Sequence, residues 1–219
     1  MESPDGTLQA EFSINTAGRL VYRVLQNGSE VLLPSPLGVT VDGVDLGSSA
    51  LNVSLKSLVE INETYPLLAA RSTATNHCHE ATLAVRRTGD LEFSFELQVR
   101  VYDDGVAYRY VIPAPRLGDP HAPRTLSGEA SGWVVPDGSI VWHQDQTENY
   151  EADFRSLEVG YFDIDVGGQL TVELPGSPPA GYLFISEAAM RNYSGMTLRG
   201  QFLSGLLQAT FLDDTTWQM

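Results

Sequence analysis

Apolar and polar residues alternate along most of this 219-residue chain, and a helical period of apolar positions is almost absent. Alternation with a period of two places every second side chain on one face of a β-strand. Gly, Pro, Asn and Asp separate the alternating runs and supply the conformations that turns need. The predicted strands are residues 8–14, 20–26, 30–33, 50–56, 80–87, 91–102, 106–113, 132–135, 139–143, 160–165, 169–174 and 182–186. The pattern therefore predicts an all-β, antiparallel chain.

The clearest predicted hairpin covers residues 91–113, with its turn at Asp103, Asp104 and Gly105. One face of its first strand is apolar throughout, with Phe93, Phe95, Leu97, Val99 and Val101. Many strands with one apolar face bury that face better between two packed sheets than in one open sheet. We therefore expect a single β-sandwich domain over residues 1–219.

Charge and composition narrow the classes of partner. Asp and Glu total 28 against 13 Lys and Arg, and a net charge of -15 repels phosphate backbones, so we expect no nucleic-acid partner. No run approaches the roughly 18–20 apolar residues that span a bilayer, so we expect no membrane span. Residues 1–6 lack a basic start and an apolar run, so an exported parent protein would have lost its leader.

Glu187 is the most informative candidate site residue. Residues 182–185 are predicted to form a buried strand, Glu187 falls where that strand ends, and residues 192–195 supply a turn that returns the chain into residues 196–199. A carboxylate at the end of a rigid strand can reach a metal or a sugar hydroxyl. The alternative is a solvated glutamate at the mouth of a loop.

Three weaker groups have a structural alternative. His77 and His79 flank Cys78, the single cysteine, and alternation puts both histidines on one strand face, but no distant ligand with zinc spacing is visible. A hydrogen-bonded strand edge is the competing interpretation. Arg100 and Arg109, with Asp103 and Asp104, form a functional charge cluster or cross-strand pairs at a hairpin end. Asp163 and Asp165 alternate beside two glycines, a spacing that hints at cation binding.

Several motifs, taken in order, resemble the N-terminal domain of glycoside hydrolase family 97. They are PSPLG at 34–38, DDGVAYRY within 100–113, NYE at 149–151, FISEA at 184–188 and NYSGM at 192–196. The resemblance covers nearly the whole chain from Ser3 onward. It implies a galactose-mutarotase-like antiparallel β-super-sandwich that precedes a catalytic (β/α)8 barrel in a bacterial exo-acting α-glycosidase.

The same resemblance implies a calcium-dependent enzyme whose barrel supplies the catalytic carboxylates. By motif position, Glu187 matches the one glutamate that the N-terminal domain contributes to the calcium, as a ligand and not as the acid or base. The implied partners are the barrel and an α-linked oligosaccharide, and the implied location of the parent protein is periplasmic or secreted. The chain is expected to stop before the barrel, and before the last strands of the sandwich domain itself, and therefore to be inactive by itself.

Two other functions remain open at this point. A free-standing sugar epimerase of mutarotase type would use a histidine acid and a glutamate base, with His143 beside Trp142 and before Glu148 and Glu151 as the best candidates. The other possible acids are His77, His79 and His121. A carbohydrate-binding module would use exposed aromatic rings as stacking surfaces. The candidates are Trp133, Trp142, Tyr150 and Tyr161.

Overall fold

The alternating segments form β-strands, and every pairing between named strands is antiparallel. The computed structural model describes residues 1–49, 51–68, 71–87, 90–114, 119, 121–144, 152–167, 169–178, 180–189, 193, 195–211 and 217–218. The predicted all-β, antiparallel fold is confirmed.

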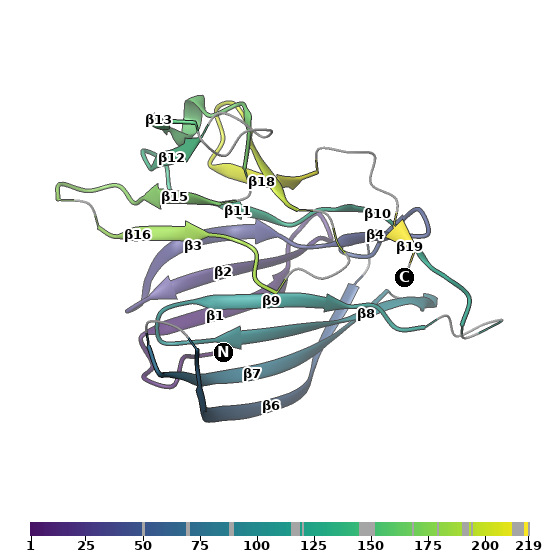
Figure 1. Cartoon of the computed structure of the whole chain (residues 1–219). Helices are drawn as coiled ribbons and strands as arrows, with labels where there is room; N and C mark the ends of the chain where they lie inside the picture. The colour runs from purple at the N-terminus through teal and green to yellow at the C-terminus, as the bar shows by residue number, and fades with distance from the viewer. Residues whose placement is uncertain are drawn as a thin grey trace.

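The largest sheet has seven strands and brings β1 to β3, from the beginning of the chain, together with later strands as far as β18 (Figure 1). In spatial order its strands are β1 (Leu8–Ile14), β2 (Leu20–Gln26), β3 (Ser29–Pro36), β11 (Gly132–Val134), β18 (Leu206–Thr210), β17 (Thr197–Gly200) and β14 (Asp165–Gly167). The β2–β3 connection has only two residues, Asn27 and Gly28, with φ of 50° and 80°. These left-handed values fit the tight hairpin that an Asn-Gly pair predicts.

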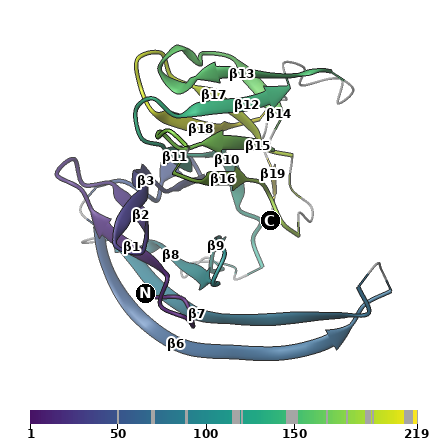
Figure 2. The ribbon, with the colours of Figure 1, turned by 90° about the vertical axis from the view of Figure 1, so that its left-hand side faces the viewer.

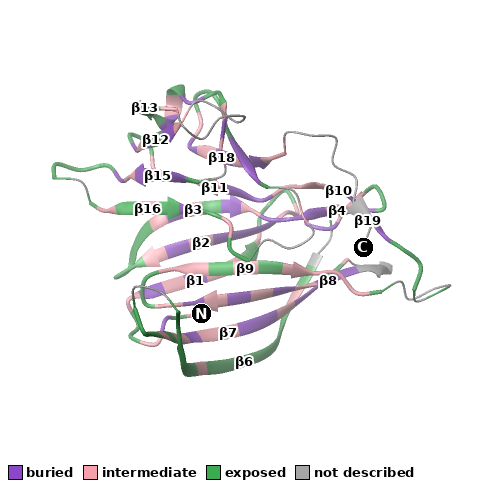
Figure 3. Cartoon of the chain, in the orientation of Figure 1, coloured by how far each residue is buried: buried purple, intermediate pink, exposed green. Residues whose placement is uncertain are grey.

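A four-stranded sheet faces the β1–β3 part of the large sheet. It consists of β6 (Leu51–Pro66), β7 (Thr73–Arg87), β8 (Asp90–Val101) and β9 (Val106–Val111), in that order. On β8, Phe95, Leu97, Val99 and Val101 are buried, as the alternation predicts. Figure 2 shows β6 and β7 as a long curved ribbon that extends away from the rest of the molecule, and β6 is exposed along most of its length (Figure 3).

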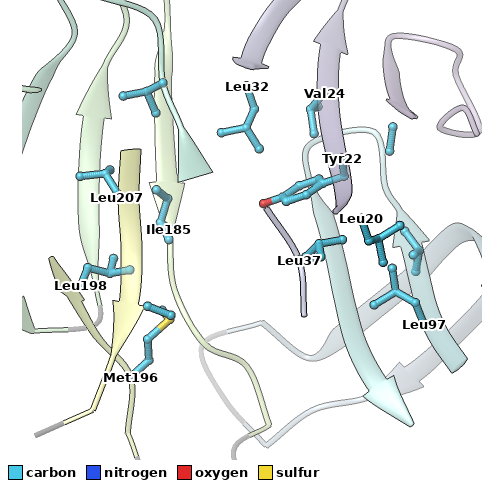
Figure 4. Packing of buried hydrophobic residues seen from close by; sticks show 14 of the residues in the cluster. Leu20, Tyr22, Val24, Leu32, Leu37, Leu97, Ile185, Met196, Leu198 and Leu207 are labelled. Atoms are coloured by element: carbon cyan, nitrogen blue, oxygen red, sulfur yellow. The ribbon is translucent and has the colours of Figure 1, made fainter. Parts of the chain in front are cut away.

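Two further four-stranded sheets, made of shorter strands, complete the architecture. One contains β13 (Phe154–Glu158), β12 (Ile140–Gln144), β15 (Leu170–Glu173) and β16 (Tyr182–Ile185). The other contains β19 (Trp217–Gln218), β10 (Thr125–Glu129), β4 (Val39–Val41) and β5 (Val44–Asp45). A single cluster of buried apolar side chains includes residues from all four sheets, and Figure 4 shows part of it. The core is therefore continuous.

Some predicted boundaries are wrong. Residues 160–165 were predicted to be a strand, but Val159–Tyr161 form a 3-10 turn and β14 begins only at Asp165. Val159 and Phe162 are both buried, three positions apart, which suits a 3-10 turn and not a strand. The strands predicted at 50–56 and 80–87 are too short, because β6 extends to Pro66 and β7 begins at Thr73. Within the described residues, no helix is long and apolar enough to cross a membrane.

Candidate functional site

Glu187 lies directly beyond β16, in the connection that leads to β17. The buried side chains of Ile185 and Met196 hold the two ends of this connection, and Figure 4 shows them near Leu198 and Leu207 of the large sheet. Apolar burial on both sides fixes where the connection begins and ends. Ser186 is exposed and Glu187 is half-buried, so the chain leaves the core at this glutamate, as the sequence predicts.

The Glu187 carboxylate is turned toward backbone polar groups. Its Oε2 accepts a hydrogen bond from the Met196 backbone N–H at 2.7 Å, which closes a nine-residue span of the connection. The Ser186 hydroxyl donates to the Glu187 carbonyl oxygen at 3.2 Å. A carboxylate that accepts from a backbone N–H is held in one direction. Glu187 therefore has a fixed orientation and is not a freely solvated loop glutamate.

A second carboxylate, Glu129, lies close to this connection. Glu129 is the last residue of β10, and its Oε2 accepts a hydrogen bond from the Tyr193 hydroxyl at 2.9 Å. Tyr193 also packs edge-on against Phe211, with ring centroids 5.5 Å apart. Neither Glu129 nor Tyr193 stood out as a site residue in the sequence. The two residues are 64 positions apart, and no local motif indicates that they meet.

Negative charge accumulates at this point of the molecule. Burial raises the pKa of the Glu129 carboxyl, and the charge of Glu187 raises it further, while hydrogen bonds from Ser131 and Tyr193 oppose the rise. Burial also raises the pKa of the Tyr193 hydroxyl, and the negative charges of Glu129 and Glu187 raise it further. A bound cation would stabilise the ionised form of every group in this cluster.

The donor atoms of the cluster suit calcium but are too few to hold it. Calcium takes six to eight hard oxygen ligands, and carboxylates are its preferred side-chain donors. Among the residues that the structure describes, no group of three or more His, Cys, Asp or Glu side chains could hold a metal ion. Glu187, with Glu129 beside its connection, therefore fits the edge of a calcium site whose other ligands would have to come from other protein.

The histidines around Cys78 do not form a metal centre within the described chain. His77 Nε2 lies 2.9 Å from Glu60 Oε1 on the neighbouring strand, and His79 Nδ1 donates to the Glu2 carbonyl oxygen at 2.8 Å. Cys78, which separates them in the sequence, is buried. Both histidines are hydrogen-bonded, as the alternative interpretation expects, but the predicted strand edge is wrong because β7 lies between β6 and β8.

The charged residues at the β8–β9 hairpin make cross-strand pairs. Arg100 donates to Glu80 at 2.6 Å, and Arg109 donates to Gln98 at 2.6 Å. The Asp103 carboxylate instead accepts the Asp5 backbone N–H at 3.0 Å. These residues hold strands and the N-terminal segment together, and they form no common site.

Asp163 and Asp165 do not share a strand, since Asp163 precedes β14 and is exposed. Asp165 forms an ion pair with Arg199 on the adjacent β17 at 2.5 Å. Its other carboxylate oxygen accepts a hydrogen bond from the Thr210 hydroxyl at 3.2 Å. The role of Asp165 is therefore to join neighbouring strands.

The residues proposed for an epimerase do not converge in the described chain. His143 is 3% exposed and packs edge-on against Phe162, with ring centroids 4.9 Å apart, whereas the adjacent Trp142 is 40% exposed. Successive side chains on β12 point to opposite faces, so these two residues do not line one sugar site. Glu148 and Glu151 lie outside the described residues. His121, the remaining acid candidate, is exposed.

The aromatic stacking candidates are scattered in the same way. Trp133 is half-buried and packs on the core. Tyr161 is 60% exposed and contacts Phe202 edge-on, with ring centroids 6.5 Å apart. Trp142 is held by a hydrogen bond from its Nε1 to Glu173 at 3.3 Å. Tyr150 lies outside the described residues, so the four rings do not form one described platform.

Known proteins similar to this chain are glycosidases several times its length. A retaining α-galactosidase from Bacteroides thetaiotaomicron is 33% identical over 210 residues, which cover 90% of this chain and 30% of that enzyme. The crystal structure of a β-arabinopyranosidase matches 100% of this chain and 37% of its own, with a TM-score of 0.84 and 19% identity. This chain therefore spans about a third of the length of these relatives.

A glycoside hydrolase family 97 enzyme from Pseudoalteromonas sp. strain K8 has a similar fold. It matches 99% of this chain and 34% of its own, with a TM-score of 0.81 and 18% identity. The model of the family described as glycosyl-hydrolase 97 N-terminal matches residues 1–218. The resemblance inferred from the motifs is confirmed, and the chain belongs to the glycosyl-hydrolase 97 N-terminal family.

Proposed function

We propose that this chain is a non-catalytic N-terminal domain of an exo-acting α-glycosidase, which packs on a catalytic (β/α)8 barrel and contributes Glu187 to an active-site calcium ion. The single observation that carries the proposal is the position of Glu187. Glu187 lies just beyond the end of β16, and the Met196 N–H holds one of its carboxylate oxygens at 2.7 Å. A second carboxylate, Glu129, is close enough for the charge of Glu187 to raise its pKa. A fixed carboxylate in a negatively charged cluster is suited to bind a hard cation.

Coordination chemistry explains why two domains would both have to supply ligands to the calcium ion. Glu187 alone can supply at most two of the six or more oxygens that calcium needs, so the remaining ligands would come from the barrel. When bound, calcium would supply positive charge that shifts the pKa of nearby catalytic carboxyl groups and helps to orient the attacking water. Within this chain, the role of Glu187 is to present a carboxylate oxygen at the domain boundary.

The proposed substrates are α-linked galactosides or glucosides, and the name of the Bacteroides thetaiotaomicron relative favours galactosides. We also propose that the parent protein is periplasmic or secreted. Hydrolysis of nitrophenyl α-galactoside and α-glucoside by the full-length protein tests the substrate class. Cell fractionation tests the location.

The calcium role is tested with Glu187→Gln in the full-length protein. The glutamine keeps an oxygen for the Met196 N–H but loses the charge, so we expect the calcium concentration for half-maximal activity to rise tenfold or more, about 1.4 kcal/mol of binding free energy. The matched control is Glu158→Gln, an exposed glutamate on β13, which should leave calcium dependence unchanged. Unaltered turnover and calcium dependence in Glu187→Gln would remove this residue from the site.

A further inference from the structure

We propose that Glu129 and Tyr193 together act as positioning residues for Glu187, a proposal that rests on the function proposed above. The Tyr193 hydroxyl donates to Glu129 Oε2 at 2.9 Å and so ties the β16–β17 connection to the end of β10. Glu187 lies in the same connection, six positions before Tyr193. The orientation of Glu187 therefore depends on a contact with a strand that is distant in the sequence.

The Glu129 end of this contact is rigid. The residue after it, Ala130, donates its backbone N–H to the Gly38 carbonyl oxygen at 2.8 Å. The Ser131 carbonyl oxygen accepts hydrogen bonds from the Ala209 N–H at 2.9 Å and from Gln208 Nε2 at 2.8 Å. The Ser131 hydroxyl is hydrogen-bonded to the Tyr110 hydroxyl at 2.6 Å. Because β18, β9 and the loop residue Gly38 all hold this segment, Glu129 has a fixed position from which it can hold Tyr193.

The connection itself needs such a fixed point. Ala189, two residues after Glu187, has a φ of 54° in the left-handed region, which is unfavourable for residues other than glycine. A strained residue persists when its surroundings over-determine the backbone. The Glu187–Met196 and Glu129–Tyr193 hydrogen bonds provide that determination, one within the connection and one to the core.

Glu129 acts through Tyr193 and is assigned no role on the substrate. One of its oxygens accepts the tyrosine hydroxyl, and an amide oxygen at the same place would accept it equally well. Removal of the hydroxyl or of the acceptor should free the connection and misplace Glu187. Removal of the charge alone should not, and this difference separates a positioning role from that of a calcium ligand.

The test uses four variants of the full-length protein. Tyr193→Phe and Glu129→Ala should raise the calcium concentration for half-maximal activity about fivefold, the effect of one lost hydrogen bond, with KM nearly unchanged. Glu129→Gln should stay within about twofold of the wild type, since it keeps the acceptor. Tyr161→Phe, which changes an exposed tyrosine outside the connection, is the control.

Hydrogen exchange without calcium gives a second, activity-independent readout. Tyr193→Phe should speed exchange of the Met196 amide and of its neighbours, while the core strands β8 and β18 keep their protection. Wild-type calcium dependence in Tyr193→Phe and Glu129→Ala, together with a shift in Glu187→Gln, would overturn this proposal and keep the proposed function. An unchanged calcium concentration for half-maximal activity in Glu187→Gln would contradict both this proposal and the proposed function. Equal impairment in Glu129→Gln and Glu129→Ala would refute the hydrogen-bonding role.

Discussion

Gly200 in β17 shows how tightly a single position is determined near the candidate site. A Cβ atom at this residue would lie 2.0 Å from the Phe162 carbonyl oxygen and 2.3 Å from Phe162 Cδ1. Phe162 is fully buried, so neither atom has room to withdraw. Only glycine lets β17 approach the chain beside Phe162, and β17 in turn receives the connection that carries Glu187.

At the residue scale we expect Gly200→Ala to destabilise the chain by about 2 kcal/mol or more, because overpacking forces the backbone to move. Urea denaturation measures this change. Gly167→Ala in the adjacent β14 is the control, since no heavy atom lies within 4 Å of its Cβ position. Its effect should stay within about 0.5 kcal/mol. Equal stability of the two variants would contradict the packing argument.

At the scale of elements, both faces of β16 carry large apolar side chains, but one face is buried and the other is exposed. Ile185 is 5% exposed and packs in the core, whereas Tyr182 and Phe184 are 64% and 68% exposed. The register places Phe184 beside Thr171 of β15, and Thr171 beside Trp142 of β12, so the exposed rings share the outer face of this sheet. An aromatic outer face lies directly beside the strand end that carries Glu187.

The two faces of β16 should respond differently to the same substitution. Ile185→Thr should cost about 2 kcal/mol in the free energy of unfolding, because it removes buried apolar surface and buries a hydroxyl. Phe184→Thr should change that free energy by less than about 0.5 kcal/mol. Thermal and urea unfolding of the two variants measure this. A larger cost at Phe184 would mean that the outer face is buried in solution.

At the scale of the whole molecule, a group of tyrosines joins the two largest sheets. Tyr22 on β2 contacts Tyr108 on β9 with ring centroids 5.4 Å apart, and Tyr108 contacts Tyr110 at 6.0 Å. The Tyr110 hydroxyl accepts the Gly38 N–H at 2.9 Å and is bonded to Ser131. Burial raises the pKa of all three hydroxyls above the usual value of 10.0.

These raised pKa values predict a loss of stability in alkali. The folded state keeps the three hydroxyls protonated while the unfolded chain ionises them near pH 10.0, so their stabilising contribution is complete below that pH and falls above it. Phenolate absorbance and circular dichroism should show these tyrosines ionising only as the chain unfolds. Titration of all nine tyrosines near pH 10.0 in a folded chain would contradict the burial of this group.

Sequence patterns identified some elements well and others poorly, for physical reasons. The β8–β9 hairpin was predictable because one of its faces is buried and its alternation is clear. The part of β6 after residue 56 was missed because nearly all of its side chains are exposed, on both faces. Without a buried face, a strand shows no regular alternation of apolar and polar residues. β4, β5 and β10 are two to five residues long, too short for alternation to stand out.

The sequence by itself determined the all-β class, the antiparallel order of the main hairpins and the place of Glu187 at a strand end, because these depend on local alternation and turn residues. Tertiary structure alone decided which side chains meet at that end. Glu129 and Tyr193 are 64 residues apart, and their contact exists only because β10 and the β16–β17 connection pack against one core. Contacts across such separations depend on how sheets stack, which no local pattern encodes.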